Sequence, residues 1–120
     1  MTAPTRRILV AEDEAMISML LEDFLEQLDY EVASLCMSGA QCQSFLDSGE
    51  VIDGAILDCN LADGPVWEVA RRLQADGVPF MFASGDGGHG VPPDLSSAPV
   101  LGKPYFLDSL ERSLSGLFSA

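Results

Sequence analysis

Basic residues are scarce in this 120-residue chain, which has six Lys and Arg residues against nineteen Asp and Glu residues and a formal net charge of −13. A field of that sign repels nucleic acid and anionic lipid, so we expect neither as a direct partner. Cysteine is also infrequent, and Cys36, Cys42 and Cys59 form neither a CxxC motif nor a Cys/His cluster. The spacing therefore indicates reduced thiols rather than a disulfide framework or a zinc site.

Long apolar segments are missing as well. No stretch approaches the ~18 apolar residues of a membrane span. The N-terminal "MTAPTRR" leads straight into "ILVA", which is too short for the apolar region of a signal peptide. We therefore expect a cytoplasmic protein without membrane contact. The length fits one domain, residues 1–120, whose single core needs no metal or disulfide.

Short apolar runs alternate with amphipathic segments along the chain. We expect helices at residues 14–28, 40–46, 65–77 and 105–118, and strands at residues 7–11, 31–34, 55–57, 79–83 and 100–101. Before the last strand, residues 85–98 form a segment dense in Gly, Pro and Ser, which we call the Gly/Pro-rich loop. It leaves room for at most a short or disordered fourth helix. The alternation predicts a doubly wound α/β domain with a five-stranded parallel sheet of order 2-1-3-4-5.

Helical spacing also predicts where individual side chains lie. Met16 and Met19 recur with Leu and Ile residues and are expected in the core, and Phe106 is expected on the apolar face of the last helix. Pro65 suits the first position of the third helix. The single histidine, His89, lies in the Gly/Pro-rich loop, where we expect it to be solvated.

Polar side chains follow four of the expected strands, namely Glu12 and Asp13, then Asp58, then Ser84, then Lys103. In the expected strand order these ends meet at one edge of the sheet, where such folds bind ligands. Crowded carboxylates repel one another unless a cation sits among them, and hard oxygen ligands suit Mg²⁺. Asp58 would act as a nucleophile toward a phosphoryl group, whose charge Mg²⁺, Lys103 and Ser84 could neutralise.

Four motifs together resemble the receiver domain of bacterial two-component response regulators. "LVAEDE" resembles the acidic pair after the first strand, "ILDCNL" the phosphoacceptor strand, "FASG" the strand that ends in a hydroxyl, and "GKP" the lysine with its proline. The resemblance covers essentially the whole chain and implies the flavodoxin-like receiver fold. It also implies that Asp58 accepts a phosphoryl group from a histidine of a sensor histidine kinase or a histidine phosphotransfer protein.

The same resemblance implies a role for each site residue. Asp13 and Asp58 would ligate Mg²⁺ together with the backbone carbonyl of Asn60, and Glu12 would act through metal-bound water. Ser84 and Lys103 would hold the phosphoryl oxygens, and the peptide after Lys103 would be cis, as is typical of the family.

Two departures separate the chain from typical receivers. The position three residues before the conserved lysine is usually aromatic and here is Val100, and the fourth helix gives way to the Gly/Pro-rich loop. The stretch "PFMFASGDGG" resembles an atypical subgroup with a Phe-Ala-Thr/Ser-Gly signature. We therefore expect phosphorylation to change the order of the loop instead of rotating an aromatic. Tyr105 is either a displaced aromatic or, in the simpler interpretation, a packing residue.

The predicted function is that of a stand-alone receiver, which catalyses only its own phosphorylation and dephosphorylation. It would act through a downstream protein or drain phosphate from a branched relay. One alternative is a phosphate-independent adaptor with a receiver fold, which Val100 and the loop favour. Another is a small Mg²⁺-dependent phosphohydrolase, but Asn60 stands where such enzymes commonly carry a general acid.

Overall fold

A parallel sheet of five strands forms the centre of the protein. The computed structural model describes residues 5–88 and 90–118, so the prediction for His89 lies outside the described residues. The sheet has the order β2-β1-β3-β6-β7, and its strands are β1 (Arg7–Ala11), β2 (Glu31–Cys36), β3 (Gly54–Asp58), β6 (Phe80–Ser84) and β7 (Val100–Gly102). Two further segments, β4 (Asn60–Leu61) and β5 (Gly64–Pro65), pair with each other beside it. The predicted order of the five main strands is confirmed.

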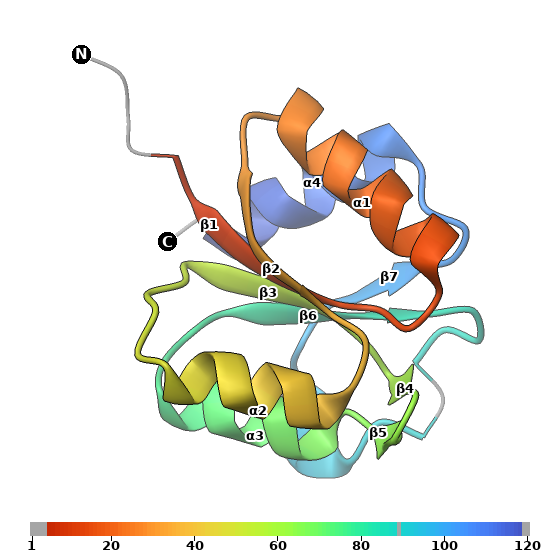
Figure 1. Ribbon diagram of the computed structural model, residues 1–120. Helices are drawn as coiled ribbons and strands as arrows, with labels where there is room; N and C mark the ends of the chain where they lie inside the picture. The colour runs from red at the N-terminus through yellow and green to blue at the C-terminus, as the bar shows by residue number, and fades with distance from the viewer. Residues whose placement is uncertain (1–4, 89, 119–120) are drawn as a thin grey trace.

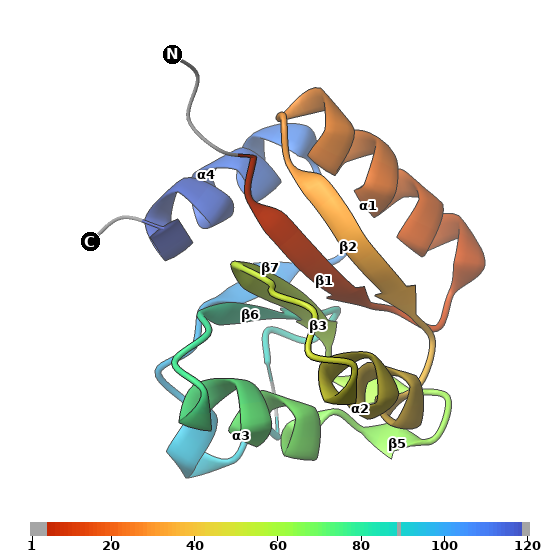
Figure 2. The same ribbon diagram turned by 60° about the vertical axis from the view of Figure 1, so that its left-hand side comes forward.

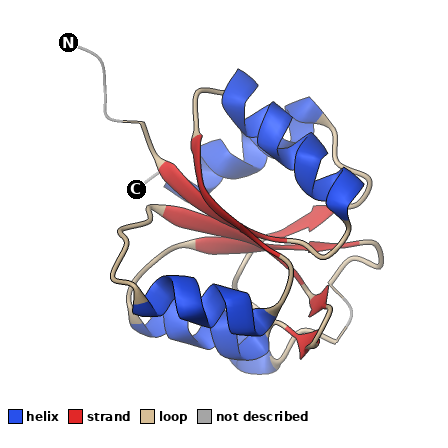
Figure 3. Ribbon diagram, viewed as in Figure 1, coloured by secondary structure: helices blue, strands red, loops and turns tan. Residues whose placement is uncertain are grey.

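Four α-helices among the described residues cover the two faces of the sheet. They are α1 (Ala15–Gln27), α2 (Gly39–Asp47), α3 (Trp67–Ala75) and α4 (Leu107–Phe118). Helices α1 and α4 lie on one face, and α2 and α3 lie on the other (Figures 1 and 2). The resulting three layers are visible when the ribbon is coloured by secondary structure (Figure 3).

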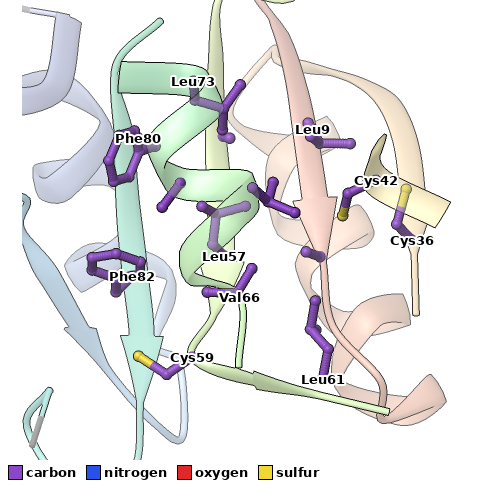
Figure 4. Close-up of a cluster of buried hydrophobic side chains, with 14 of the residues drawn as sticks. Leu9, Cys36, Cys42, Leu57, Cys59, Leu61, Val66, Leu73, Phe80 and Phe82 are labelled. Atoms are coloured by element: carbon purple, nitrogen blue, oxygen red, sulfur yellow. The ribbon is translucent and has the colours of Figure 1, made fainter. Parts of the chain in front are cut away.

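The core consists of two clusters, one on each face of the sheet, because side chains alternate along each strand. The cluster under α1 and α4 contains Ile8, Val10, Ile56 and Met81 among others. The cluster under α2 and α3 contains Leu9, Leu57, Phe80 and Phe82, together with all three cysteines (Figure 4). These cysteines are free, as the sequence predicted, and all three are buried.

Most element bounds shift by one or two residues from the sequence prediction, and two of the differences matter for the fold. Strand β2 extends two residues further, to Cys36. Pro65 belongs to β5 and pairs with Asn60, so its assignment to the first helical position is wrong. The third helix begins at Trp67 instead, after Val66, whose N–H donates to the carbonyl of Cys59 at 3.0 Å.

The core assignment of Met16, Met19 and Phe106 is also wrong. Met16 is 85 % exposed and Met19 66 %, and they line a surface hollow on α1 with Leu20 and the acidic residues Glu22, Asp23 and Glu26. The buried face of α1 is formed by Leu21 and Leu25, which lie on another arc of the helix. Phe106 is 64 % exposed because it precedes α4, whose buried residues are Leu110 and Leu114.

The Gly/Pro-rich loop is anchored at its C-terminal half. It contains one 3₁₀ turn (Pro93–Leu95), as expected for a poor helical segment, and Leu95 is fully buried. Asp94 accepts hydrogen bonds from the guanidinium of Arg71 on α3 at 2.9 and 3.3 Å. At the other end of the loop, Gly88 has φ +84° and lies so close to Val100 that a Cβ would sit 2.8 Å from a valine methyl.

Within residues 5–88 and 90–118, no helix has the length and apolar character that a membrane crossing requires.

Candidate functional site

The carboxyl ends of four strands lie in register at one edge of the sheet. Ala11 of β1 pairs with Leu57 of β3, and Asp58 pairs with Ala83 of β6. Ser84 in turn pairs with Gly102 of β7, whose next residue is Lys103. Parallel pairing therefore brings the polar residues after each strand together, although the chain separates the first from the last by ninety or so positions.

An ammonium group joins two of the buried carboxylates. The Nζ of Lys103 lies 2.9 Å from Glu12 Oε1 and 2.9 Å from Asp58 Oδ2. Glu12 is 1 % exposed and Asp58 is 8 % exposed, so both charges are largely removed from water. Burial lowers the pKa of Lys103, but its hydrogen bonds to the two carboxylates outweigh this effect and raise it. The lysine is therefore a fixed cation in the site.

The acidic residues form a cluster that suits a divalent cation. One carboxylate oxygen from each of Glu12, Asp13 and Asp58 lies within 4.8 Å of the others. Burial raises the pKa of Glu12 to about 7, since the lowering effect of Lys103 is opposed by the hydrogen bond to Asp58. Three acids around one ammonium leave excess negative charge, and hard oxygen donors are the ligands that Mg²⁺ prefers. The residues present therefore fit a magnesium ion.

Asn60 contributes through its backbone. Its N–H donates to Asp58 Oδ1 at 3.3 Å, while its side chain is exposed. In the β4–β5 ladder Asn60 is paired with Pro65, which has no N–H and so cannot donate to the Asn60 carbonyl. The Asn60 backbone is thus tied to Asp58 of the acidic cluster.

The hydroxyl of Ser84 is held by the loop that follows it. Ser84 is 7 % exposed, and its Oγ donates a short hydrogen bond to Asp86 Oδ1. The Asp86 N–H donates back to the same Oγ at 3.2 Å. Ser84 thus reaches the edge of the site with its hydroxyl proton directed to the loop, and a phosphoryl oxygen would have to compete for it.

Tyr105 is a neighbour of the site that sequence reasoning missed. It is 4 % exposed, and its hydroxyl donates to Glu12 Oε1 at 3.3 Å. The simpler interpretation as a packing residue is confirmed, but its polar end touches the acidic cluster. The available signal was its position directly after Pro104, whose peptide with Lys103 is cis as the resemblance implied.

Two structures of proteins named SdrG are more than one-third identical in sequence to this chain. SdrG from Sphingomonas melonis Fr1 is 36% identical, with a TM-score of 0.85 and coverage of 98% of this chain and 100% of that chain. The BeF3-activated conformation of SdrG from Pseudomonas melonis Fr1 is 38% identical, with a TM-score of 0.78 and coverage of 94% of this chain and 96% of that chain.

A more distant structure agrees in fold. The response regulator receiver domain (CheY-like) from Methylobacillus flagellatus is 22% identical, with a TM-score of 0.81 and coverage of 95% of this chain and 99% of that chain. No family model matches the chain, and no curated protein sequence matches it.

Proposed function

Because the chain belongs to the response regulator receiver domains, we propose that Asp58 accepts a phosphoryl group from a histidine of a partner protein. Residues 1–120 would form one receiver domain, working in the cytoplasm. The observation that carries the proposal is the contact of Lys103 with Asp58 at 2.9 Å beside the acidic cluster. A carboxylate, a fixed cation and further acids at one sheet edge are the parts that phosphoryl transfer to aspartate needs.

Asp13, Asp58 and the Asn60 carbonyl would hold Mg²⁺ directly, and Glu12 would act through water on the ion. When bound, Mg²⁺ would neutralise charge on the phosphoryl oxygens. Glu12 and Asp58 are both held by Lys103. This contact keeps two of the acids close together despite their mutual repulsion, so the site is arranged in advance.

In the transfer step an oxygen of Asp58 attacks phosphorus. The P–N bond to the donor histidine breaks, and its electron pair stays on the imidazole. Lys103 and Ser84 would then bond the phosphoryl oxygens, for which Ser84 must exchange its contact with Asp86. Hydrolysis reverses the modification when water attacks phosphorus and the P–O bond to Asp58 breaks, which releases inorganic phosphate. No substrate other than the donor is needed, so the chain would act as a signalling protein and not as an enzyme on other molecules.

The donor would be a sensor histidine kinase or a histidine phosphotransfer protein. Helix α1 begins at Ala15, at the sheet edge that carries the site (Figure 1). A donor histidine that reaches Asp58 must therefore lie close to the first turns of α1, where Met16 and Met19 are exposed. Methionine side chains adapt to a partner surface, and we assign this patch to donor docking. The phosphorylated form would then signal through a downstream protein or act as a phosphate sink.

Mass spectrometry tests the proposal. The intact mass should rise by one phosphoryl group after exposure to acetyl phosphate with Mg²⁺, and remain unchanged without Mg²⁺ or in Asp58→Ala. Asp53→Ala is the matched control, because Asp53 directly precedes β3, at the end opposite to Asp58. A mass that never changes, even with histidine donors, would favour the phosphate-independent adaptor, and turnover of an external phosphoester would favour the phosphohydrolase.

A further inference from the structure

Tyr105 lies between the catalytic edge of the sheet and helix α4. Its ring belongs to the apolar cluster under α1 and α4, with Leu101, Leu110 and Leu114 among its members. Only 4 % of the residue is exposed. A buried tyrosine hydroxyl needs a hydrogen-bond partner, since leaving it without one costs free energy. The partner it has is a carboxylate of the acidic cluster.

Both oxygens of Glu12 are held by the protein. Oε1 accepts from the Tyr105 hydroxyl at 3.3 Å and is 2.9 Å from Lys103 Nζ. Oε2 accepts from the N–H of Glu14 at 3.2 Å. These contacts come from two parts of the chain, residues 103–105 and Glu14, and together they fix the plane of a carboxylate that is almost fully buried.

Once Asp58 is phosphorylated, Lys103 has a third group to bond besides Glu12 and Asp58. In this structure its ammonium is shared between Glu12 and Asp58. Under the proposed function, one of its hydrogen bonds to these carboxylates would be replaced by a bond to a phosphoryl oxygen. Tyr105 and the Glu14 N–H are then the donors that still hold Glu12, and Tyr105 is rigid because its ring is packed in the core.

We propose that Tyr105 is a positioning residue of the acidic site, whose hydroxyl holds the Glu12 carboxylate in the orientation that Mg²⁺ binding requires. The inference rests on the proposed function, since it concerns the same site. Tyr105 acts through Glu12 and contacts neither the ion nor the phosphoryl group. It also connects the site to the start of α4 by direct packing.

The test is a titration with Mg²⁺ alone, followed by the backbone amide signals of the chain in NMR spectra. Tyr105→Phe removes only the hydroxyl and keeps the ring that packs in the core. We expect it to raise the Kd for Mg²⁺ about threefold to tenfold. Tyr30→Phe is the matched control, because Tyr30 stacks on Phe118 instead of contacting the acidic cluster. It should leave the Kd within about twofold, because it removes a hydroxyl that does not touch the acidic cluster and keeps the ring.

A double-variant cycle with Glu12→Gln separates positioning from a general structural effect. If Tyr105 acts through Glu12, adding Tyr105→Phe to Glu12→Gln should weaken Mg²⁺ binding no further. An unchanged Kd in Tyr105→Phe, or a full additional loss in the double variant, would overturn the inference while leaving the proposed function intact. A wild-type chain that binds no Mg²⁺ would instead overturn the proposed function and the inference with it.

Discussion

Replacing Glu12 with glutamine should stabilise the protein in Mg²⁺-free buffer at pH 8. Glu12 is 1 % exposed, and burial is the main reason that its pKa rises from 4.5 to about 7. A rise of that size corresponds to about 3 kcal/mol by which folding disfavours the charged carboxylate. Glutamine carries no charge, but its amide has a single acceptor oxygen. It weakens the bonds from Lys103 and Tyr105 and loses the bond from the Glu14 N–H, at a cost of about 1–2 kcal/mol. The free energy of unfolding should therefore rise by about 1–2 kcal/mol.

The gain should depend on pH in a defined direction. Between about pH 4.5 and pH 7 the folded chain binds a proton at Glu12 that the unfolded chain has already lost. The contribution of Glu12 to stability therefore falls as pH rises through this window and levels off above it. Near pH 5 the carboxyl is protonated in the folded state, so the advantage of the glutamine variant should disappear there.

Urea denaturation at pH 5, 6, 7 and 8 with a chelator measures this difference, and the single tryptophan, Trp67, reports unfolding. Glu26→Gln on the exposed face of α1 is the control and should show no pH-dependent gain. A difference between wild type and Glu12→Gln that stays constant across this range would refute the reasoning. So would a variant that is less stable than wild type at pH 8.

Three further results are expected. Met16→Glu should lower phosphotransfer from whichever histidine donor modifies the wild type by at least about tenfold. Labelling by acetyl phosphate should stay unchanged, and so should phosphotransfer to the control Val51→Glu, whose side chain is also exposed. Gly88→Ala should cost about 1–2 kcal/mol more in urea unfolding than Gly87→Ala, since both have positive φ but only Gly88 would clash with Val100; equal costs would contradict the contact. Amide exchange in the Gly/Pro-rich loop should change when BeF₃⁻ and Mg²⁺ are added, and identical exchange would exclude the loop as the switch.

The sheet and its strand order could be predicted because buried parallel strands have a simple sequence pattern. Continuous apolar runs such as residues 8–11 are covered on both faces, and each ends at a polar residue. The spacing of Asp58, Ser84 and Lys103 follows from the strand pattern, so the meeting of these residues at one edge could also be expected. The order of the parallel strands is enough to bring the residues at their carboxyl ends together.

The exposed methionines could not be predicted from helical spacing. Met16 and Met19 continue an apolar stripe that also contains Ile17, Leu21 and Leu25, so the stripe is wider than the face that the sheet can cover. Hydropathy alone does not say which arc of the helix turns inward. The packing of α1 against β2 and the shared apolar cluster with α4 decides it, and this depends on residues distant in sequence.

The contact of Tyr105 with Glu12 depends on tertiary structure in the same way. The two residues are 93 positions apart, and a tyrosine after a proline is compatible with packing alone. The prediction for Pro65 was wrong for a local reason, because proline suits both a helix start and a strand edge. The short ladder with Asn60 selects the second option.

Chemical mapping of the phosphorylated residue tests the central claim most directly. Borohydride reduces an acyl phosphate of aspartate to homoserine, and peptide sequencing by mass spectrometry then locates the reduced residue. After treatment with acetyl phosphate and Mg²⁺, we expect homoserine at position 58 and at no other aspartate. Reduction at another aspartate, or phosphate found on a serine, would contradict it.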